Sequence, residues 1–177
     1  KKPGTVRIIG GRWRGRRLPV ADLPGLRPSG DRGRETLFNW LQADIRNANC
    51  VDLFAGTGVL GLEAVSRGAG QVTLVDKDPR AARAIEQSVE LLSSDPGKAK
   101  VRVINTDALH WLQSCPAGQL DIVFIDPPFG SGLEGRALEL IDQNDCLARG
   151  ALVYLETPRQ SAETPLSGGW ITDREKL

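Results

Sequence analysis

Residues 51–61 read VDLFAGTGVLG, an apolar run that passes through a glycine-rich turn into a second apolar segment. Gly56, Gly58 and Gly61 satisfy the G-x-G-x-x-G spacing of a turn that joins a β-strand to the N-terminus of a helix. Asp76 lies twenty residues after Gly56, where such folds place a ribose-binding acid. The stretch predicts a Rossmann-like fold, and its spacing alone fits either a nicotinamide dinucleotide or S-adenosyl-L-methionine.

Strand-like and helix-like segments alternate on both sides of this turn. We expect strands at 50–54, 71–76, 100–104, 120–125 and 150–155, and helices at 31–45, 59–67, 79–93, 107–114 and 134–147. This alternation predicts an α/β fold with a mostly parallel, twisted sheet and helices on both faces. Ligands of such sheets bind outside the carboxyl ends of the strands.

The N-terminal segment differs from the rest of the chain. Residues 6–18 predict a glycine-hinged β-hairpin with basic side chains outward, and residues 19–28 predict a loop. We therefore divide the chain into a basic arm, residues 1–30, and a cofactor-binding domain, residues 31–177. The strand-and-turn pattern near Leu177 suggests that a closing strand is cut short, and the chain contains no Met.

Composition narrows the class of protein. With 177 residues, 40% hydrophobic and 25% charged, the chain suits one soluble globular domain. No apolar run approaches the roughly 18 residues of a membrane helix, and the first residues do not resemble a signal peptide. Three widely spaced cysteines predict reduced thiols in a cytoplasmic protein, with no metal site.

Charge is distributed unevenly along the chain. Residues 1–34 hold ten of the 23 Lys and Arg but two of the 22 Asp and Glu, so a basic arm precedes an acidic body. This pattern indicates a polyanionic partner such as a nucleic acid. The alternative is a solvated basic tail.

Four aspartates lie at the ends of four successive predicted strands, namely Asp52, Asp76, Asp107 and Asp126. Asp52 favours S-adenosyl-L-methionine, because a carboxylate attracts its ammonium and sulfonium and repels the pyrophosphate of a dinucleotide. Turn or helix capping is the alternative for Asp52 and Asp107, and Asp78 is a further capping candidate. The expected cofactor-binding residues are Asp52, Phe54, Ala55, Gly56, Thr57, Gly58, Asp76, Lys77, Asp107 and Ala108.

The run Asp126-Pro127-Pro128-Phe129 ends an apolar strand with a carboxylate and two prolines. Prolines have fixed φ and no N–H, so this edge is stiff and presents bare carbonyl oxygens. Such an edge can accept hydrogen bonds from an amine on a flat ring while Phe129 stacks on that ring. The motif predicts a pocket for a nucleobase amine.

Together these motifs resemble the Rossmann-like methyltransferases that act on exocyclic amines. The stretches Arg7-Ile8-Ile9-Gly10-Gly11 and Leu26–Leu41 further resemble the bacterial small-subunit (16S) ribosomal RNA guanine-N(2) methyltransferase family, over about Val6 to Leu177. The resemblance implies methyl transfer from S-adenosyl-L-methionine to a guanine N2 amine, with S-adenosyl-L-homocysteine as product. Ribosomal RNA or an assembling small subunit is the implied partner, and we expect a monomer. Ser29-Gly30 and Gly33 depart from the family pattern.

The resemblance also implies residue roles. The carboxylate of Asp126 and the carbonyl of Pro127 hold the amine, and Pro128 and Phe129 shape the base pocket. The expected RNA-binding residues are Arg12, Trp13, Arg14, Arg16, Arg17, Arg27 and Arg32, with Arg34 near the cofactor cleft. Trp13 can alternatively cover the sheet edge.

Three other functions remain open at this stage. An adenine-amine methyltransferase shares the Asp-Pro-Pro-Phe edge, a nicotinamide-dependent oxidoreductase shares the glycine turn, and an RNA-binding protein could keep the fold without turnover.

Overall fold

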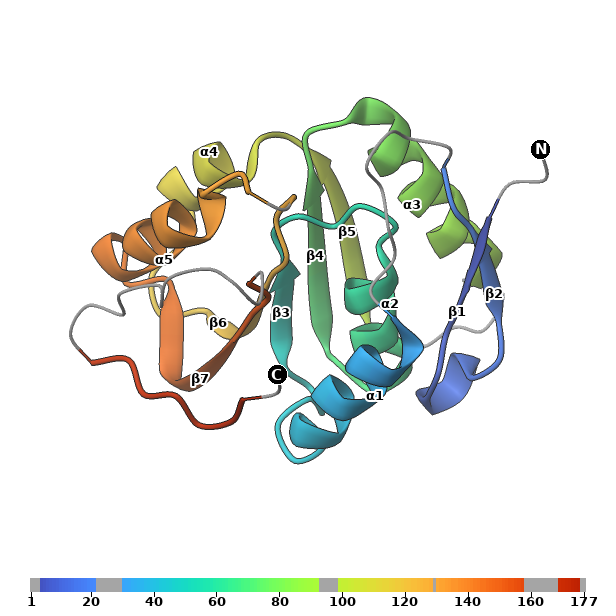
Figure 1. Ribbon diagram of the computed structural model, residues 1–177, viewed down its shortest axis with the longest axis horizontal. Helices are drawn as coiled ribbons and strands as arrows, with labels where there is room; N and C mark the ends of the chain where they lie inside the picture. The colour runs from blue at the N-terminus through green and yellow to red at the C-terminus, as the bar shows by residue number, and fades with distance from the viewer. Residues whose placement is uncertain (1–3, 22–29, 93–98, 129, 158–168, 176–177) are drawn as a thin grey trace.

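The computed structural model describes residues 4–21, 30–92, 99–128, 130–157 and 169–175. Its centre is a five-stranded, wholly parallel sheet in the order β5-β4-β3-β6-β7 (Figure 1). The strands are β3 (Asn49–Asp52), β4 (Gln71–Asp76), β5 (Lys100–Asn105), β6 (Leu120–Ile125) and β7 (Leu147–Leu155). The helices are α1 (Asp31–Trp40), α2 (Val59–Ser66), α3 (Pro79–Leu92), α4 (Ala108–Gln113) and α5 (Leu133–Gln143). The predicted α/β class is confirmed.

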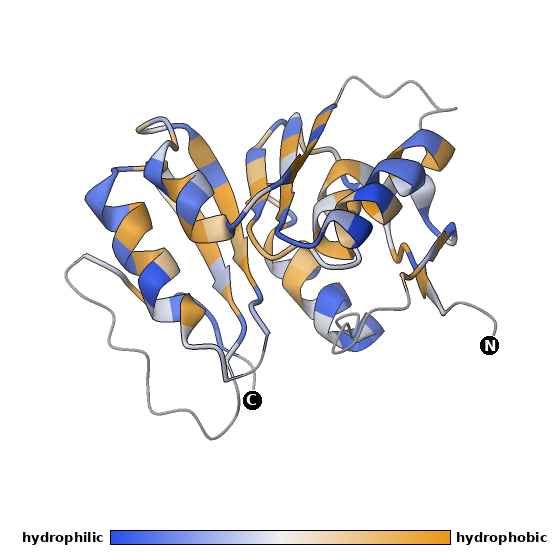
Figure 2. Ribbon diagram, turned by 90° about the horizontal axis from the view of Figure 1, so that it is seen from above, coloured by the Kyte–Doolittle hydropathy of each residue, from blue (hydrophilic) through white to orange (hydrophobic). Residues whose placement is uncertain are grey.

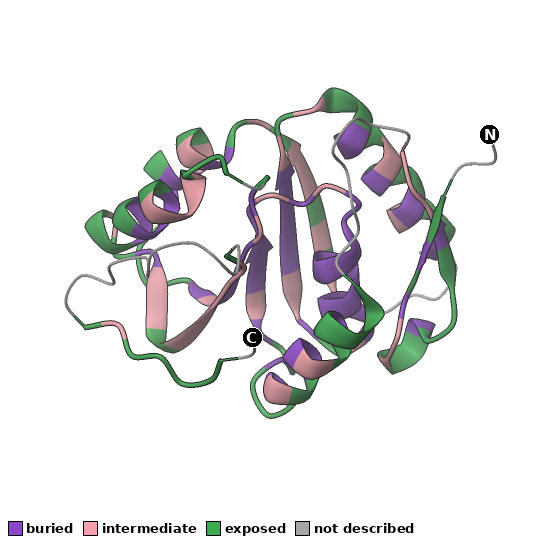
Figure 3. Ribbon diagram, viewed as in Figure 1, coloured by how far each residue is buried: buried purple, intermediate pink, exposed green. Residues whose placement is uncertain are grey.

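Helices cover both faces of the sheet. One core contains Phe38 of α1, Leu60 of α2 and Ile85 of α3, and the other contains Leu112 of α4 and Ile141 of α5. Apolar residues dominate the central strands, and the helices carry apolar and polar residues on different sides (Figure 2). The three central strands β3, β4 and β6 are the most buried, and β3 and β4 are visible as such in Figure 3. These two cores explain why the strands read as nearly continuous apolar runs.

The strand order reverses between β3 and β6. From β3 the chain proceeds to β4 and β5 on one side, whereas β6 is followed by β7 on the other. Such a switch point opens a crevice at the carboxyl ends of the two adjacent strands. Asp52 ends β3 and Asp126 follows β6, so both acids lie at this crevice.

A small antiparallel ribbon packs outside α2. It consists of β1 (Thr5–Arg7), the 3-10 turn η1 (Gly11–Trp13) and β2 (Arg17–Pro19), so the expected hairpin contains a helical turn. Gly11 has φ of +72°, and a Cβ there would lie 2.0 Å from the Ser66 carbonyl oxygen. Only glycine permits this close approach. Every residue of α2 is buried as a result.

The ribbon is attached through the buried carboxylate of Glu63 on α2. It accepts hydrogen bonds from the backbone N–H groups of Ile9 at 2.8 Å and Gly10 at 2.7 Å, and from Arg67 Nε at 2.8 Å. Val6, Ile8 and Leu18 also belong to the α1–α3 core. The expected boundary at residue 30 stays a prediction, although the ribbon and the following helices share one core.

Several expected boundaries shift. The strand expected at 50–54 ends at Asp52, and the helix expected at 31–45 ends at Trp40. The helix expected at 134–147 ends at Gln143, because Asp145 reverses the chain with φ of +49° and β7 starts at Leu147. Among the described residues, none of the helices is both long and apolar enough to span a bilayer. The three cysteines are buried free thiols.

Candidate active site

Asp52 lies at the base of the crevice and is 1% exposed. Its Oδ2 accepts a hydrogen bond from the Gly61 N–H of α2 at 3.2 Å, whereas its buried Oδ1 has no partner among the described residues. The pKa of Asp52 is raised to about 7, mainly by burial and further by the nearby carboxylates of Asp126 and Asp76, against the lowering effect of the backbone N–H groups of Gly61 and Phe54. One oxygen of the carboxylate therefore caps α2, as the capping alternative predicts, and the other oxygen can accept a hydrogen bond from a ligand.

The glycine turn wraps around this carboxylate. Gly56 and Gly58 have φ of +54° and +73°, so the turn uses the left-handed conformation that glycine adopts readily. A Cβ at Gly58 would lie 2.9 Å from Ile85 Cγ1 of α3, and one at Gly61 would lie 2.7 Å from Leu74 Cδ2 of β4. The turn is thus tightly packed against the sheet, as the sequence motif predicts.

Asp76 closes the neighbouring strand and faces the same turn. Its Oδ2 accepts the Gly56 N–H at 2.7 Å, and its Oδ1 accepts the Asp78 N–H at 2.8 Å. Asp78, not Asp76, accepts the Arg80 N–H at the start of α3, at 2.8 Å. Asp76 therefore fixes the turn without capping a helix, while Lys77 is exposed beside it.

Asp107 is the N-cap of α4. Its Oδ1 accepts from the N–H groups of Leu109 at 2.9 Å and His110 at 3.2 Å, as the capping alternative predicts. Asp107 is exposed and the following Ala108 is buried. A cap does not prevent the carboxylate from accepting an adenine amine, because a carboxylate has about four acceptor sites.

The proline edge leaves the sheet next to Asp52. Leu53 N–H donates to the Phe124 carbonyl of β6 at 3.1 Å, so β3 and β6 remain paired up to the crevice. Asp126 is half-buried, Pro127 is buried and Pro128 is exposed. Phe129, expected to stack on a base, lies outside the described residues.

The basic arm needs one correction. Trp13, expected to stack on RNA, is 5% exposed and packs in the α1–α3 core, where its backbone N–H donates to Ser66 Oγ of α2 at 2.9 Å. The guanidinium of Arg12 lies 4.6 Å from the Trp13 ring centre. Arg14 and Arg17 are exposed, and Arg16 is exposed but donates to the Leu91 carbonyl at 2.8 Å. Arg32 is exposed on α1, and Arg27 lies outside the described residues.

Arg34, expected near the cofactor cleft, is buried, with ion-pair partners on α1 and α2. Its side chain donates to Asp31 Oδ1 at 2.6 Å and to the Arg7 carbonyl at 2.9 Å, and it lies 3.5 Å from Glu63 Oε2. Asp31 is the first residue of α1 and pairs with Arg7 and Arg34. Sequence reasoning missed Glu63, whose only signal was one acid within an otherwise apolar helix.

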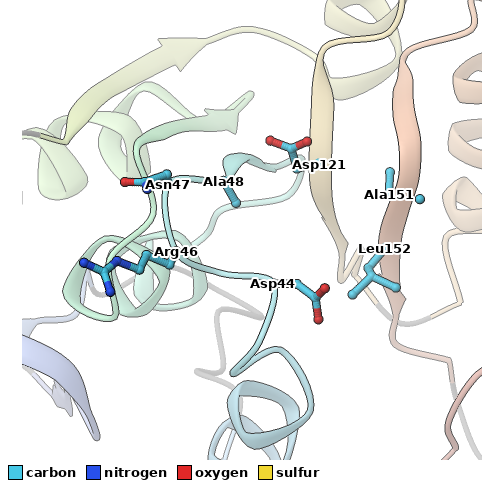
Figure 4. Close-up of a pocket in the computed structure, with 8 residues that line it drawn as sticks. Asp44, Arg46, Asn47, Ala48, Asp121, Ala151 and Leu152 are labelled. Atoms are coloured by element: carbon cyan, nitrogen blue, oxygen red, sulfur yellow. The ribbon is translucent and has the colours of Figure 1, made fainter.

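A measurable pocket lies at the other end of the sheet. It has a volume of about 230 Å³ and is lined by residues before β3, at the start of β6 and in β7 (Figure 4). Asp44, Arg46 and Asp121 are among the lining residues. Because the strands are parallel, this pocket lies at their amino ends, away from Asp52. It carries none of the motifs that point to chemistry.

The residues at the crevice fit a cationic cofactor. The unpartnered Oδ1 of Asp52 is an acceptor without a donor, and its carboxylate is surrounded by acids and backbone N–H groups. Within the described parts of the chain, no cluster of three or more His, Cys, Asp and Glu has the arrangement of a metal site.

Comparison with known proteins places the chain in a family. Residues 6–177 match the family described as conserved hypothetical protein 95. The Escherichia coli (strain K12) protein named ribosomal RNA small subunit methyltransferase D is 45% identical over 184 residues, covering 100% of this chain and 89% of that one.

The chain belongs to the ribosomal RNA small subunit methyltransferase D family.

Other members of the family agree with this assignment. The Haemophilus influenzae methyltransferase D is 45% identical over 158 residues, covering 88% of this chain and 80% of its own. The solved structure of yhhF from Escherichia coli superposes with a TM-score of 0.85 at 42% identity, covering 98% of this chain and 92% of that chain. The resemblance stated from the motifs and the Rossmann-like fold are both confirmed.

Proposed function

We propose that the protein transfers the methyl group of S-adenosyl-L-methionine to the exocyclic N2 amine of a guanine in small-subunit ribosomal RNA. The observation that carries the proposal is the placement of Asp52 and Asp126 at the switch point, one with a buried unpartnered oxygen and the other before two prolines. The named relatives support the ribosomal RNA substrate. Guanine N2 is the finer step, and it rests on the motif resemblance.

The sign of the charge selects the cofactor. Asp52, Asp76 and Asp126 make the crevice acidic, so a pyrophosphate at the glycine turn is repelled. S-adenosyl-L-methionine supplies a methyl group on a sulfonium and carries an ammonium, and both charges are attracted by these carboxylates. Asp52 Oδ1 accepts from the ammonium, and Asp76 accepts from the ribose hydroxyls.

Asp126 and Pro127 hold the nucleophile. An aromatic amine is a poor nucleophile because its lone pair is delocalised into the ring. When the carboxylate of Asp126 and the carbonyl of Pro127 accept its two hydrogens, the lone pair is directed towards the methyl group. As the N–CH3 bond forms, the S–CH3 bond of the sulfonium breaks and S-adenosyl-L-homocysteine leaves. Positive charge builds on the nitrogen in the transition state, so both hydrogen bonds strengthen there and lower the barrier, and the methylated amine then gives its extra proton to the Asp126 carboxylate, which passes it to solvent.

RNA binding brings the base to this edge. The amine is reached only when the nucleotide leaves its stack, and stacking on Phe129 compensates part of that cost, by about 1–3 kcal/mol. Arg14 and Arg17 are exposed on the ribbon and contact phosphates. The substrate is RNA, either free or within an assembling small subunit.

Methyl transfer from labelled S-adenosyl-L-methionine tests the proposal. Purified protein is incubated with unmethylated small-subunit RNA and with subunit particles, and the digested nucleosides are identified by mass spectrometry. We expect N2-methylguanosine at one mapped nucleotide. Labelled N6-methyladenosine would instead support an adenine-amine enzyme, and absence of label from both substrates would contradict the proposal.

Two variants locate the chemistry. Asp126→Ala is expected to lose at least about 100-fold in turnover while RNA binding survives, because a hydrogen bond that strengthens in the transition state is removed. Asp142→Ala, an exposed acid on α5, is the matched control and keeps full activity. Full activity of Asp126→Ala would refute the assignment of Asp126.

A further inference from the structure

Glu156 leaves the sheet beside Asp126. Strands β6 and β7 are parallel and in register up to Ile125 and Leu155, and the Glu156 N–H donates to the Ile125 carbonyl at 3.0 Å. The next residues along the two strands are Asp126 and Glu156. Two carboxylate-bearing residues are therefore adjacent where the proposed base pocket begins.

Tyr154 fixes the carboxylate of Glu156. Its hydroxyl donates to Glu156 Oε2 at 3.1 Å. Burial raises the pKa of Tyr154, and the carboxylates of Glu156 and then Asp126 raise it further. The phenol therefore stays protonated and donates its hydrogen bond, and its pKa depends on the charges of both acids. Residues 154 and 156 lie on the same side of the strand because side chains alternate along it.

This side of the sheet faces the α1 side of the molecule. Phe124, the partner of Tyr154 across the strand pair, packs at 5.9 Å between ring centres against Phe38 of α1. Phe124 belongs to the core that also contains the ribbon residues, and Tyr154 is partly buried and packs against that core. Asp52, whose buried Oδ1 is the proposed acceptor for the cofactor ammonium, ends β3 on the other side of β6, so the proposed cofactor and base sites share this edge of the sheet. Glu156 therefore follows the edge strand β7, next to Asp126 and on the face of the sheet that packs against α1.

We propose that Glu156, positioned by Tyr154, accepts the N1–H of the target base and makes the enzyme specific for guanine over adenine. The inference rests on the proposed function. Guanine presents an N1–H donor beside its 2-amine, whereas adenine presents the bare N1 lone pair beside its 6-amine. A carboxylate accepts from the first and repels the second, so Glu156 separates two amines that Asp126 and Pro127 alone treat alike.

The test uses a base that keeps the amine and loses the donor. 2-Aminopurine carries the 2-amine of guanine but has an unprotonated N1. It is placed by ligation at the nucleotide mapped as methylated, and a second RNA carries guanine at the same position. For the wild type and for each variant, kcat/KM for methyl transfer is measured with each of these two RNAs. For the wild type we expect guanine to be preferred by about 10- to 100-fold, the range of one hydrogen bond to a charged group.

Variants of Glu156 should remove this preference. With Glu156→Ala, the ratio of kcat/KM for the guanine RNA to kcat/KM for the 2-aminopurine RNA falls, mainly because activity on guanine is lost. The ratio that remains reflects only the different chemical reactivity of the two amines. With Glu156→Gln the ratio also narrows, because the amide can donate to the bare N1 of 2-aminopurine. Tyr154→Phe keeps the carboxylate but frees its rotation, so a smaller decrease in the ratio is expected. Glu139→Ala, an exposed α5 position paired with Arg136, is the control and keeps the wild-type ratio.

The outcomes separate the two proposals. Variants that form N2-methylguanine with the unchanged wild-type ratio overturn the role of Glu156 and leave the proposed function intact. A wild-type protein that forms no N2-methylguanine overturns the proposed function itself. Because Glu156→Gln preserves shape and one acceptor, it gives the ratio even if Glu156→Ala fails to fold, as judged by thermal unfolding.

Discussion

Asp52 Oδ2 accepts a hydrogen bond from the Gly61 N–H at 3.2 Å, and Oδ1 of the same carboxylate is buried with no hydrogen-bond partner in the part of the chain that the structure describes. One oxygen therefore holds the glycine turn to the first turn of α2, and the other is reserved for a ligand. A buried acceptor without a donor destabilises the folded protein until that ligand arrives. The buried oxygen lowers the stability of the ligand-free protein and raises its affinity for the ligand.

Replacing Asp52 by Asn is expected to stabilise the cofactor-free protein above pH 7. Because burial raises the pKa of Asp52 from 3.8 to about 7, its contribution to stability is fully present below about pH 4 and is lost as pH rises through about 7. Asn keeps the bond to Gly61 and carries no charge. In urea unfolding at pH 8, the free energy of unfolding of Asp52→Asn should exceed that of the wild type by about 2–4 kcal/mol. At pH 4 the two proteins should differ little.

The comparison needs a surface control. Asp142→Asn, at an exposed α5 position, should leave the unfolding free energy within about 0.5 kcal/mol at both pH values. If Asp52→Asn is less stable than the wild type at pH 8, the carboxylate has a partner that this account omits.

Cofactor affinity should depend on pH through the same group. A bound cation favours the ionised carboxylate, so binding of S-adenosyl-L-methionine releases a proton from Asp52 below about pH 7. Affinity measured by calorimetry should therefore fall by up to about tenfold per pH unit below that value. The Asp52→Asn variant should bind S-adenosyl-L-methionine more weakly, and its affinity should not change with pH in this range. If its affinity still fell with pH as in the wild type, the released proton would come from another group.

The attachment of the ribbon should depend on Glu63. Its buried carboxylate accepts from the N–H groups of Ile9 and Gly10 and pairs with the buried side chain of Arg34 and the partly exposed side chain of Arg67. Removing it leaves the Arg34 charge with fewer compensating groups, so Glu63→Ala should cost about 3–5 kcal/mol in denaturant unfolding. Glu139→Ala, which removes an exposed ion pair with Arg136, should cost less than about 0.5 kcal/mol. Equal losses in the free energy of unfolding for the two variants would mean that the buried Glu63 network stabilises the protein no more than an exposed ion pair does.

RNA affinity should depend on the exposed arginines of the ribbon and not on Trp13. Arg14→Ala and Arg17→Ala should each weaken RNA binding and lower the slope of log affinity against log salt by about 0.7–0.9. Filter binding across a salt series measures both. Arg136→Ala, on α5, is the control and leaves the slope unchanged. Trp13→Phe should lower stability with the salt slope retained, because this side chain lies in the core.

The sequence predicted the sheet and the acids at its edge, because these follow from local patterns. Apolar runs, the glycine spacing and Asp-Pro-Pro each act within a few residues. Contacts between distant segments were invisible to this reasoning. The burial of Arg34 depends on Glu63, and the burial of Trp13 depends on the close approach of Gly11 to Ser66.

Element ends were also hard to predict. The apolar pattern of α5 continues through Cys146 and Leu147, yet the helix stops at Gln143 because Asp145 adopts a positive φ. Tyr154 and Glu156 went unassigned because one strand contains no information about which acid lies beside it. Register between β6 and β7 supplied that information.

The central claim is that the acidic crevice binds a cationic methyl donor. Isothermal titration calorimetry of the wild-type protein with S-adenosyl-L-methionine, S-adenosyl-L-homocysteine and NAD tests it most directly. We predict binding of both adenosyl compounds, weakened in Asp52→Asn, and no measurable heat with NAD. Tight binding of NAD together with no binding of S-adenosyl-L-methionine would contradict the account.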